Sequence, residues 1–112
     1  MTPEERQELR DFLAREVMGA YIHPDFNAIL VWPDGHETMR SDYKPDSPSS
    51  PASQILGVIE AMRKLRWWCF WNNEENVAKF YHMDSDRIER VRADNLLDAI
   101  CLAAKAAVEG EK

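Results

Sequence analysis

The spacing of apolar residues at the start of the chain predicts a helix over about residues 3–18. Thr2 is placed to cap its first turn, Pro3 suits the first helical position, and Glu5 completes a capping box with Thr2. The apolar positions form one stripe at helical spacing, made of Leu9, Phe12, Leu13 and Val17. Gly19 ends the pattern, so we expect a helix that docks one narrow side on a single surface.

The next apolar segment, residues 26–40, reads FNAILVWPDGHETMR and predicts two strands joined by a turn. The turn is expected at Pro33, Asp34 and Gly35, because Asp-Gly between extended segments is a strong hairpin signal. Residues 41–53, SDYKPDSPSSPAS, are rich in serine and proline and predict a long surface connection.

A second amphipathic helix is predicted over about residues 51–65. Ser50 is the expected N-cap, and Pro51 is expected at the first helical position. Its apolar positions are Ile55, Leu56, Val58, Ile59, Met62 and Leu65.

The stretch LRWWCFWNN contains the most apolar strand of the chain. Alternation assigns Trp68 and Phe70 to one face, and Trp67, Cys69 and Trp71 to the other. Because both faces are apolar, this segment is expected in the interior of a sheet that is covered on both sides. The prediction also places Trp68 and Phe70 in the core.

The last third of the chain predicts two more strands and a helix. One strand is expected over residues 77–83. Residues 87–92 fit either the start of a helix or a strand, and a short, charged edge strand is the preferred interpretation. Asp94 is the expected cap of the final helix, and Gly110 is expected to stop it. The apolar side of that helix contains Leu97, Ile100, Cys101, Ala104 and Val108.

Together these elements predict one α+β domain over residues 1–112. The expected fold is an α/β/α sandwich, with a mainly antiparallel sheet of four to five strands and three helices in the order α-β-β-α-β-β-β-α. The chain is long enough to form one core without disulfides or metals.

Charge and composition restrict the classes of function. The net charge of −6 argues against binding a nucleic-acid polymer, and no stretch is apolar enough to span a membrane. Cys69 and Cys101 lie within apolar patterns, which is typical of buried, reduced thiols. A cytoplasmic protein is therefore expected.

Four motifs, in this order, resemble those of the phage ABA sandwich domain, a BC1872-like family of small phage proteins. They are REVMG, WPDG, SDYKPDSPSSPAS and ADNLLDAICLAAKAA, which together span nearly the whole chain. The resemblance implies an α/β/α sandwich and a phage or prophage origin, so the expected location is the cytoplasm of an infected bacterium. It implies no catalytic residues.

Aromatic and serine-rich segments provide two candidate ligand sites. Trp67, Trp71 and Tyr81 can stack on a nucleobase, with Arg66 or Arg87 near its phosphate; the alternative is that these rings fill the core. The second candidate is the start of the helix at 51–65, where backbone N–H groups favour anions. Around it lie Ser49, Ser50, Ser53, Tyr43, Lys44 and Arg40. The alternative there is ordinary capping and a stiff loop.

His82, Asp84 and Asp86 alternate along the chain and can point the same way in an extended segment. They suggest a divalent metal site or an enzyme acting on a phosphodiester, and ordinary turn chemistry explains them equally well. No sequence motif of a known catalytic or cofactor site is present, so no cofactor is expected.

The preferred hypothesis is a non-enzymatic phage binding protein that acts in counter-defence. Its expected partner is a host-derived small anionic ligand of nucleotide type or a host defence protein, and a homo-oligomer can bury one ligand between copies. One alternative is a protein–protein adaptor with exposed tryptophans as hot spots. Another is a phosphodiesterase-type enzyme built on His82.

Overall fold

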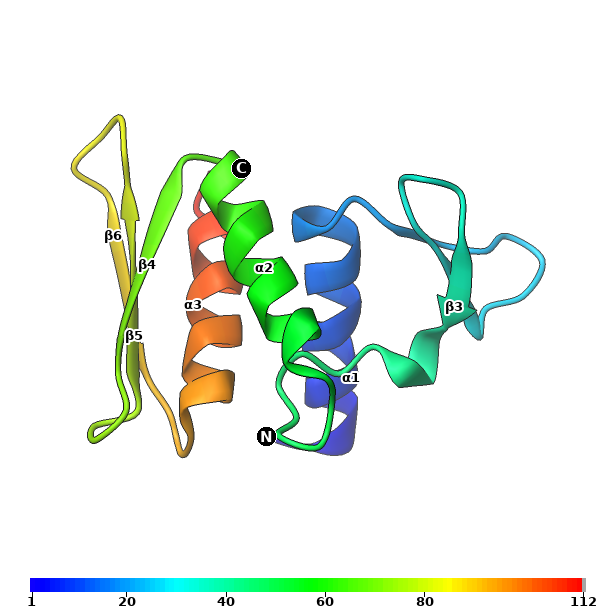
Figure 1. The fold of residues 1–112 in the computed structure, drawn as a ribbon, viewed down its shortest axis with the longest axis horizontal. Coiled ribbons are helices and arrows are strands. Elements are labelled where there is room, and N and C mark those ends of the chain that lie inside the picture. The colour runs from blue at the N-terminus through cyan, green and yellow to red at the C-terminus, as the bar shows by residue number, and fades with distance from the viewer. Residues whose placement is uncertain (112) are drawn as a thin grey trace.

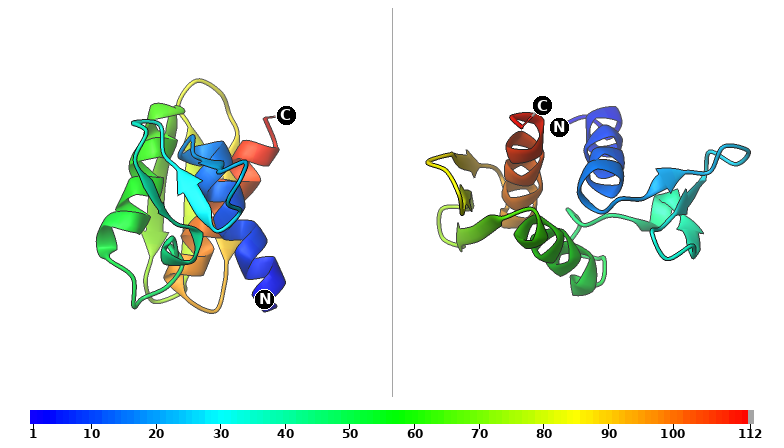
Figure 2. Two further views of the ribbon diagram at one scale, coloured as in Figure 1. Left: turned by 90° about the vertical axis from the view of Figure 1, so that its right-hand side faces the viewer. Right: turned by 90° about the horizontal axis from the view of Figure 1, so that it is seen from above.

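The computed structural model describes residues 1–111 and places a layer of helices between two sheets. Over these residues it has three α-helices, α1 (Pro3–Phe12), α2 (Ala52–Lys64) and α3 (Leu96–Glu109), and two three-stranded sheets. The sheets lie at opposite ends of the molecule, and the helices stand between them (Figure 1; Figure 2, right). The α+β class is confirmed.

The first helix begins with the predicted capping box. Thr2 Oγ1 accepts a hydrogen bond from the Glu5 N–H at 3.1 Å, and Glu5 Oε1 accepts one from the Thr2 N–H at 3.1 Å. The helix continues from α1 into a π-helical turn, η1 (Leu13–Val17). It ends at Val17, with Met18 as its C-cap. Gly19 follows with a φ of +78°, a left-handed conformation that glycine adopts without strain.

The first sheet consists of β1 (Tyr21–Ile22), β2 (Ile29–Val31) and β3 (Glu37–Met39), all antiparallel. The hairpin between β2 and β3 confirms the predicted turn, and Gly35 adopts a φ of +93° there. The strand β1 was not predicted, because two residues are too few to show an alternating pattern. A short 3-10 turn, η2 (Arg40–Asp42), follows β3.

The other two helices confirm their predicted positions, but both predicted caps are wrong by one residue. Pro51, not Ser50, occupies the N-cap of α2, and no side chain caps this helix. Asn95, not Asp94, caps α3: Asn95 Oδ1 accepts a hydrogen bond from the Asp98 N–H at 2.9 Å. Gly110 is the C-cap of α3, as predicted.

The second sheet has the strand order β4-β5-β6, with β4 (Trp67–Asn72), β5 (Val77–His82) and β6 (Ile88–Arg92) antiparallel. The prediction that β6 is an edge strand is confirmed. The prediction that the aromatic segment lies in the interior of a sheet is wrong, because β4 is the other edge.

The prediction of a single sheet of four to five strands within a sandwich is also wrong. β2 and β3 pair with β1 in a sheet of their own, so they do not extend the sheet of β4 to β6. Helices α2 and α3 cover one face of that second sheet, and its other face has no helical layer (Figure 1). Trp68 and Phe70 are on the uncovered face, 45% and 58% exposed, so the prediction that they are core residues is wrong.

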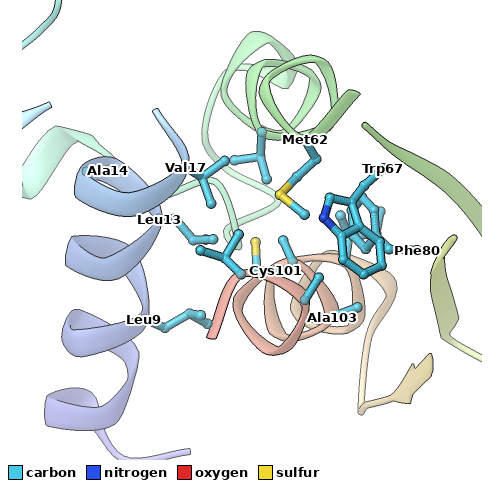
Figure 3. Packing of buried hydrophobic residues seen from close by; sticks show 14 of the residues in the cluster. Leu9, Leu13, Ala14, Val17, Met62, Trp67, Phe80, Cys101 and Ala103 are labelled. Atoms are coloured by element: carbon cyan, nitrogen blue, oxygen red, sulfur yellow. The ribbon is translucent and has the colours of Figure 1, made fainter. Parts of the chain in front are cut away.

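The core lies among the three helices and the inner face of the second sheet. Leu13, Met62 and Cys101 converge from the three helices, and Trp67 and Phe80 enclose the core on the sheet side (Figure 3). All five side chains are buried. No helix within residues 1–111 is long and apolar enough to cross a membrane.

Candidate binding surface

The face of the second sheet that points away from the helices is the main candidate surface, and we call it the outer face. Its strand residues follow from the antiparallel register and from alternation of side chains. They are Trp68, Phe70 and Asn72 of β4, Val77, Lys79 and Tyr81 of β5, and Ile88, Arg90 and Arg92 of β6.

Aromatic and aliphatic side chains on the outer face are open to solvent. Trp68, Phe70 and Ile88 are all exposed, although large apolar side chains are usually buried. Phe70 lies opposite Lys79, and its ring meets Tyr81 edge-on, with centroids 5.3 Å apart and planes at 89°. Exposed apolar side chains gathered on one face are typical of a binding surface.

The outer face is also positively charged, in a chain whose net charge is −6. Its strand positions include Lys79, Arg90 and Arg92, and none of them is acidic. Lys79 Nζ donates to the Tyr81 hydroxyl at 3.3 Å, and the Arg63 guanidinium lies 4.8 Å from the centroid of the Trp68 ring. Aromatic rings and cations are therefore neighbours on this face.

A hollow of about 330 Å³ lies at one end of the outer face. Its walls include Phe70, Tyr81, Lys79 and Arg90, with Trp71 and Glu75 at the β4–β5 end. A planar ring can lie against Phe70 or Tyr81 while an attached anion contacts Lys79 and Arg90. Of the residues predicted for a ligand site, this hollow brings together Trp71 and Tyr81.

Trp67 and Arg87, by contrast, have structural roles. Trp67 is fully buried, and its Nε1 donates to Glu111 Oε1 at 2.9 Å. The Arg87 guanidinium lies 5.1 Å from the centroid of the Trp67 ring and donates to the Ala107 carbonyl at 3.3 Å. The interpretation of Trp67 as a stacking platform is therefore corrected: its ring is not accessible to a ligand.

The predicted anion site at the start of α2 is not assembled. Arg40 forms an ion pair with Asp11 and donates to the Asn27 carbonyl at 3.1 Å, so its charge is already neutralised. Lys44 has an exposed side chain, and its backbone N–H donates to Gln54 Oε1 at 2.7 Å. The remaining serines near the helix start lie at the surface, with Ser49 and Ser53 exposed and Ser50 half-buried.

Tyr43, the other residue proposed for that site, is buried instead of facing a ligand. Its ring packs edge-on against Trp32, with centroids 5.2 Å apart. Its hydroxyl has no hydrogen-bond partner among residues 1–111. Burial, and the nearby Cys101 and Asp46, raise the pKa of Tyr43 above its ordinary range.

A buried charge cluster, which the sequence patterns did not reveal, holds the 41–53 connection in place. Asp46 accepts hydrogen bonds from Arg6 Nη1 at 2.5 Å and from Arg10 Nε at 2.7 Å. Arg6 also donates to Asp98 of α3 at 2.7 Å. Burial acts to raise the pKa of Asp46, but the bonds from Arg10 and Arg6 outweigh it and hold the pKa below its ordinary value. Since both arginines are paired with carboxylates, this cluster is not an open anion site.

Two of the three residues of the candidate metal site, Asp84 and His82, have other partners. Asp84 accepts two hydrogen bonds from the Arg66 guanidinium, at 3.0 and 3.1 Å. His82 lies edge-on to the Trp67 ring, with centroids 4.9 Å apart. Within residues 1–111, no group of three His, Cys, Asp or Glu side chains is arranged to hold a metal ion.

A second hollow, of about 460 Å³, lies between β3 and α2. Its walls are mostly apolar and include Met18, Trp32 and Tyr43, and Trp32 Nε1 already donates to Thr38 Oγ1 at 2.8 Å. No lysine or arginine lines it. An anionic ligand therefore fits the outer face better than this hollow.

No protein-family model, curated protein or solved structure matches the chain.

Proposed function

We propose that this chain is a small, non-enzymatic phage protein that binds a host-made anion of nucleotide type on the outer face of its second sheet. The observation that carries the proposal is the combination of exposed Trp68 and Phe70 with Lys79 and Arg90, on a face whose strand positions include no carboxylate. The phage origin rests on the family resemblance.

The physical support is that stacking and charge act on different parts of one ligand. A nucleobase stacked on an exposed aromatic ring gains about 1–3 kcal/mol per base. A phosphate group gains charge-assisted hydrogen bonds from lysine or arginine. Glu75 also lines the hollow, and its carboxylate can accept a hydrogen bond from a ribose hydroxyl or an exocyclic amine.

Counter-defence fits a protein of this kind because removing a signal requires only binding. A molecule held on the protein no longer reaches its host receptor, so no reaction and no cofactor are needed. The protein would have to be at least as abundant as the signal, and a short chain is cheap to produce in quantity.

Ligand titrations test the proposal. AMP, GMP and cyclic dinucleotides are titrated against the protein by calorimetry, together with Phe70→Ala. Phe70→Ala should weaken binding about five- to 150-fold, which corresponds to the loss of one stacked base. Phe26→Ala is the matched control, because Phe26 is also exposed, at 60%, and lies outside the second sheet. Absence of binding across the panel, or equal losses in the two variants, would contradict the proposal.

A host protein is the second candidate partner. The exposed side chains of Trp68, Phe70, Trp71 and Ile88 favour it, because large aromatic residues dominate the energetics of protein interfaces. A pull-down from host lysate should then recover a stoichiometric partner with the natural chain and with Phe26→Ala, but not with Trp68→Ala. Recovery that is the same with all three proteins would reject this candidate.

A further inference from the structure

The two edges of the second sheet differ in how well they are protected from pairing with another strand. The β6 edge carries Glu89, Arg90 and Arg92, and charged side chains on an edge strand oppose further pairing. The β4 edge, WWCFWN, has six residues and contains no charged residue and no proline. A long, apolar, unprotected edge strand favours pairing with a further strand.

The hydrogen-bonding pattern shows which backbone groups of β4 are available. The Met83 N–H donates to the Arg66 carbonyl at 2.8 Å, which makes Arg66 and Met83 a hydrogen-bonded pair. In an antiparallel ladder such pairs alternate with non-bonded ones. Trp68, Phe70 and Asn72 therefore direct their backbone groups to β5, while Trp67, Cys69 and Trp71 direct theirs away from it.

We propose that a second copy of this chain pairs with the β4 edge, antiparallel, with the two-fold axis beside Cys69. This register places Cys69 opposite Cys69 of the partner subunit and Trp67 opposite the partner's Trp71, so all the outward-directed residues are hydrogen-bonded. A two-fold axis at Phe70 would leave Trp67 without a partner. The symmetric interface joins the second sheets of the two subunits into one continuous sheet. This proposal goes beyond the proposed ligand binding.

The same register makes the side chains self-complementary on the outer face. Trp68 lies opposite the partner's Phe70, and Phe70 lies opposite the partner's Trp68, as two symmetric aromatic pairs. Aromatic pairs across neighbouring strands stabilise sheets. Because the charged β6 edge opposes further pairing, the assembly closes as a dimer and does not grow into a filament.

Sedimentation velocity, without added nucleotide, tests the dimer and compares two proline variants. Cys69→Pro removes an N–H directed at the open β4 edge, and Arg90→Pro removes the equivalent N–H from the β6 edge. Neither change removes a hydrogen bond to β5, which makes them a matched pair. The natural chain and Arg90→Pro should be dimeric, and Cys69→Pro should be monomeric with unchanged far-UV circular dichroism. A monomeric natural chain, or a dimeric Cys69→Pro variant, would overturn the proposal.

Disulfide trapping tests the register with variants that keep all backbone groups. Directly opposite residues in a non-bonded pair have Cα atoms about 4.5 Å apart, within the range that a disulfide spans. Both variants are made with Cys69→Ser, because this register also places the two Cys69 side chains opposite each other, where they could form a disulfide. Mild oxidation of a mixture of Trp68→Cys and Phe70→Cys should therefore give a covalent dimer that contains both variants. Each variant oxidised alone should remain unlinked. Cross-linking of either variant with itself would assign a different axis, and no linkage in the mixture would reject the interface.

Discussion

Trp67 and Trp68 are neighbours in the chain, but their side chains have opposite surroundings. Trp67 points to the helices, is 0% exposed, and has its indole N–H bonded to Glu111. Trp68 points away from the helices and is covered only in part, by the guanidinium of Arg63. One residue therefore contributes mainly to stability, and the other remains available for binding.

This contrast gives a prediction for the free energy of unfolding. Trp67→Ala should destabilise the protein by about 3–5 kcal/mol, since it removes a large buried ring and leaves a cavity. Within one subunit, Trp68→Ala should cost about 0.5–1 kcal/mol, which is typical of a cation–π contact at an exposed site. Urea denaturation of both variants measures the difference. Equal losses would mean that the outer face is covered in solution.

At the level of elements, the helices and the turn at Gly35 were predictable because their signals are local. The capping box of Thr2 and Glu5 marks the start of one helix, and Gly110 marks the end of another. Neither signal depends on distant parts of the chain. Alternation likewise separated the two faces of β4 correctly. It could not tell which face the helices cover, because docking depends on partners of Trp67 that are distant in the sequence, such as Phe80 and Glu111.

The candidate surface was only partly predictable for the same reason. Trp71 and Tyr81 belong to the predicted set, and both line the hollow on the outer face. Phe70 was assigned to the core, and Lys79 and Arg90 were not proposed at all. These three residues come from three strands and meet only through the register of the sheet, which the sequence does not encode locally.

The connection between η2 and α2 depends on one carboxylate, which leads to a pH prediction. The folded-state pKa of Asp46 lies below its ordinary value of 3.8. Its contribution to stability is therefore present above that value and is lost as the pH falls through the lower folded pKa. Asp46→Asn should cost about 3 kcal/mol at neutral pH, because it leaves Arg10 without a charged partner and Arg6 with Asp98 alone. It should also flatten the acid dependence of unfolding.

Asp84→Asn is the control for this prediction. Asp84 also accepts two hydrogen bonds from one arginine, Arg66, but both side chains are more than half exposed. Water screens such a pair, so the loss in stability should be small. Urea denaturation at several pH values compares the two variants. If Asp84→Asn proved as damaging as Asp46→Asn, the 41–53 connection would not depend on the buried cluster.

At the scale of the whole molecule, the two sheets differ in how extensively they pack on the central core. The second sheet packs on α3 and α2 through Phe80 and Trp67, which belong to the central core. The first sheet lies at the other end of the molecule (Figure 1) and has strands of only two and three residues. Of its strand residues, Leu30 belongs to the buried core, and Ile22 packs against that core half-buried. Short sheets with little apolar cover have low local stability.

Native-state hydrogen exchange should therefore show two levels of opening. Amides of β2, such as that of Leu30, are expected to exchange through a local opening with a lower free energy than those of Phe80 in β5 or Ala103 in α3. Leu30→Ala should lower the free energy of opening of the first sheet by about 2–5 kcal/mol. The exchange rate of the Phe80 amide should stay unchanged, because the second sheet does not take part in that opening. If both regions lost protection together, the two sheets would unfold as one cooperative unit, and the first sheet would owe its stability to the helices rather than to its own pairing.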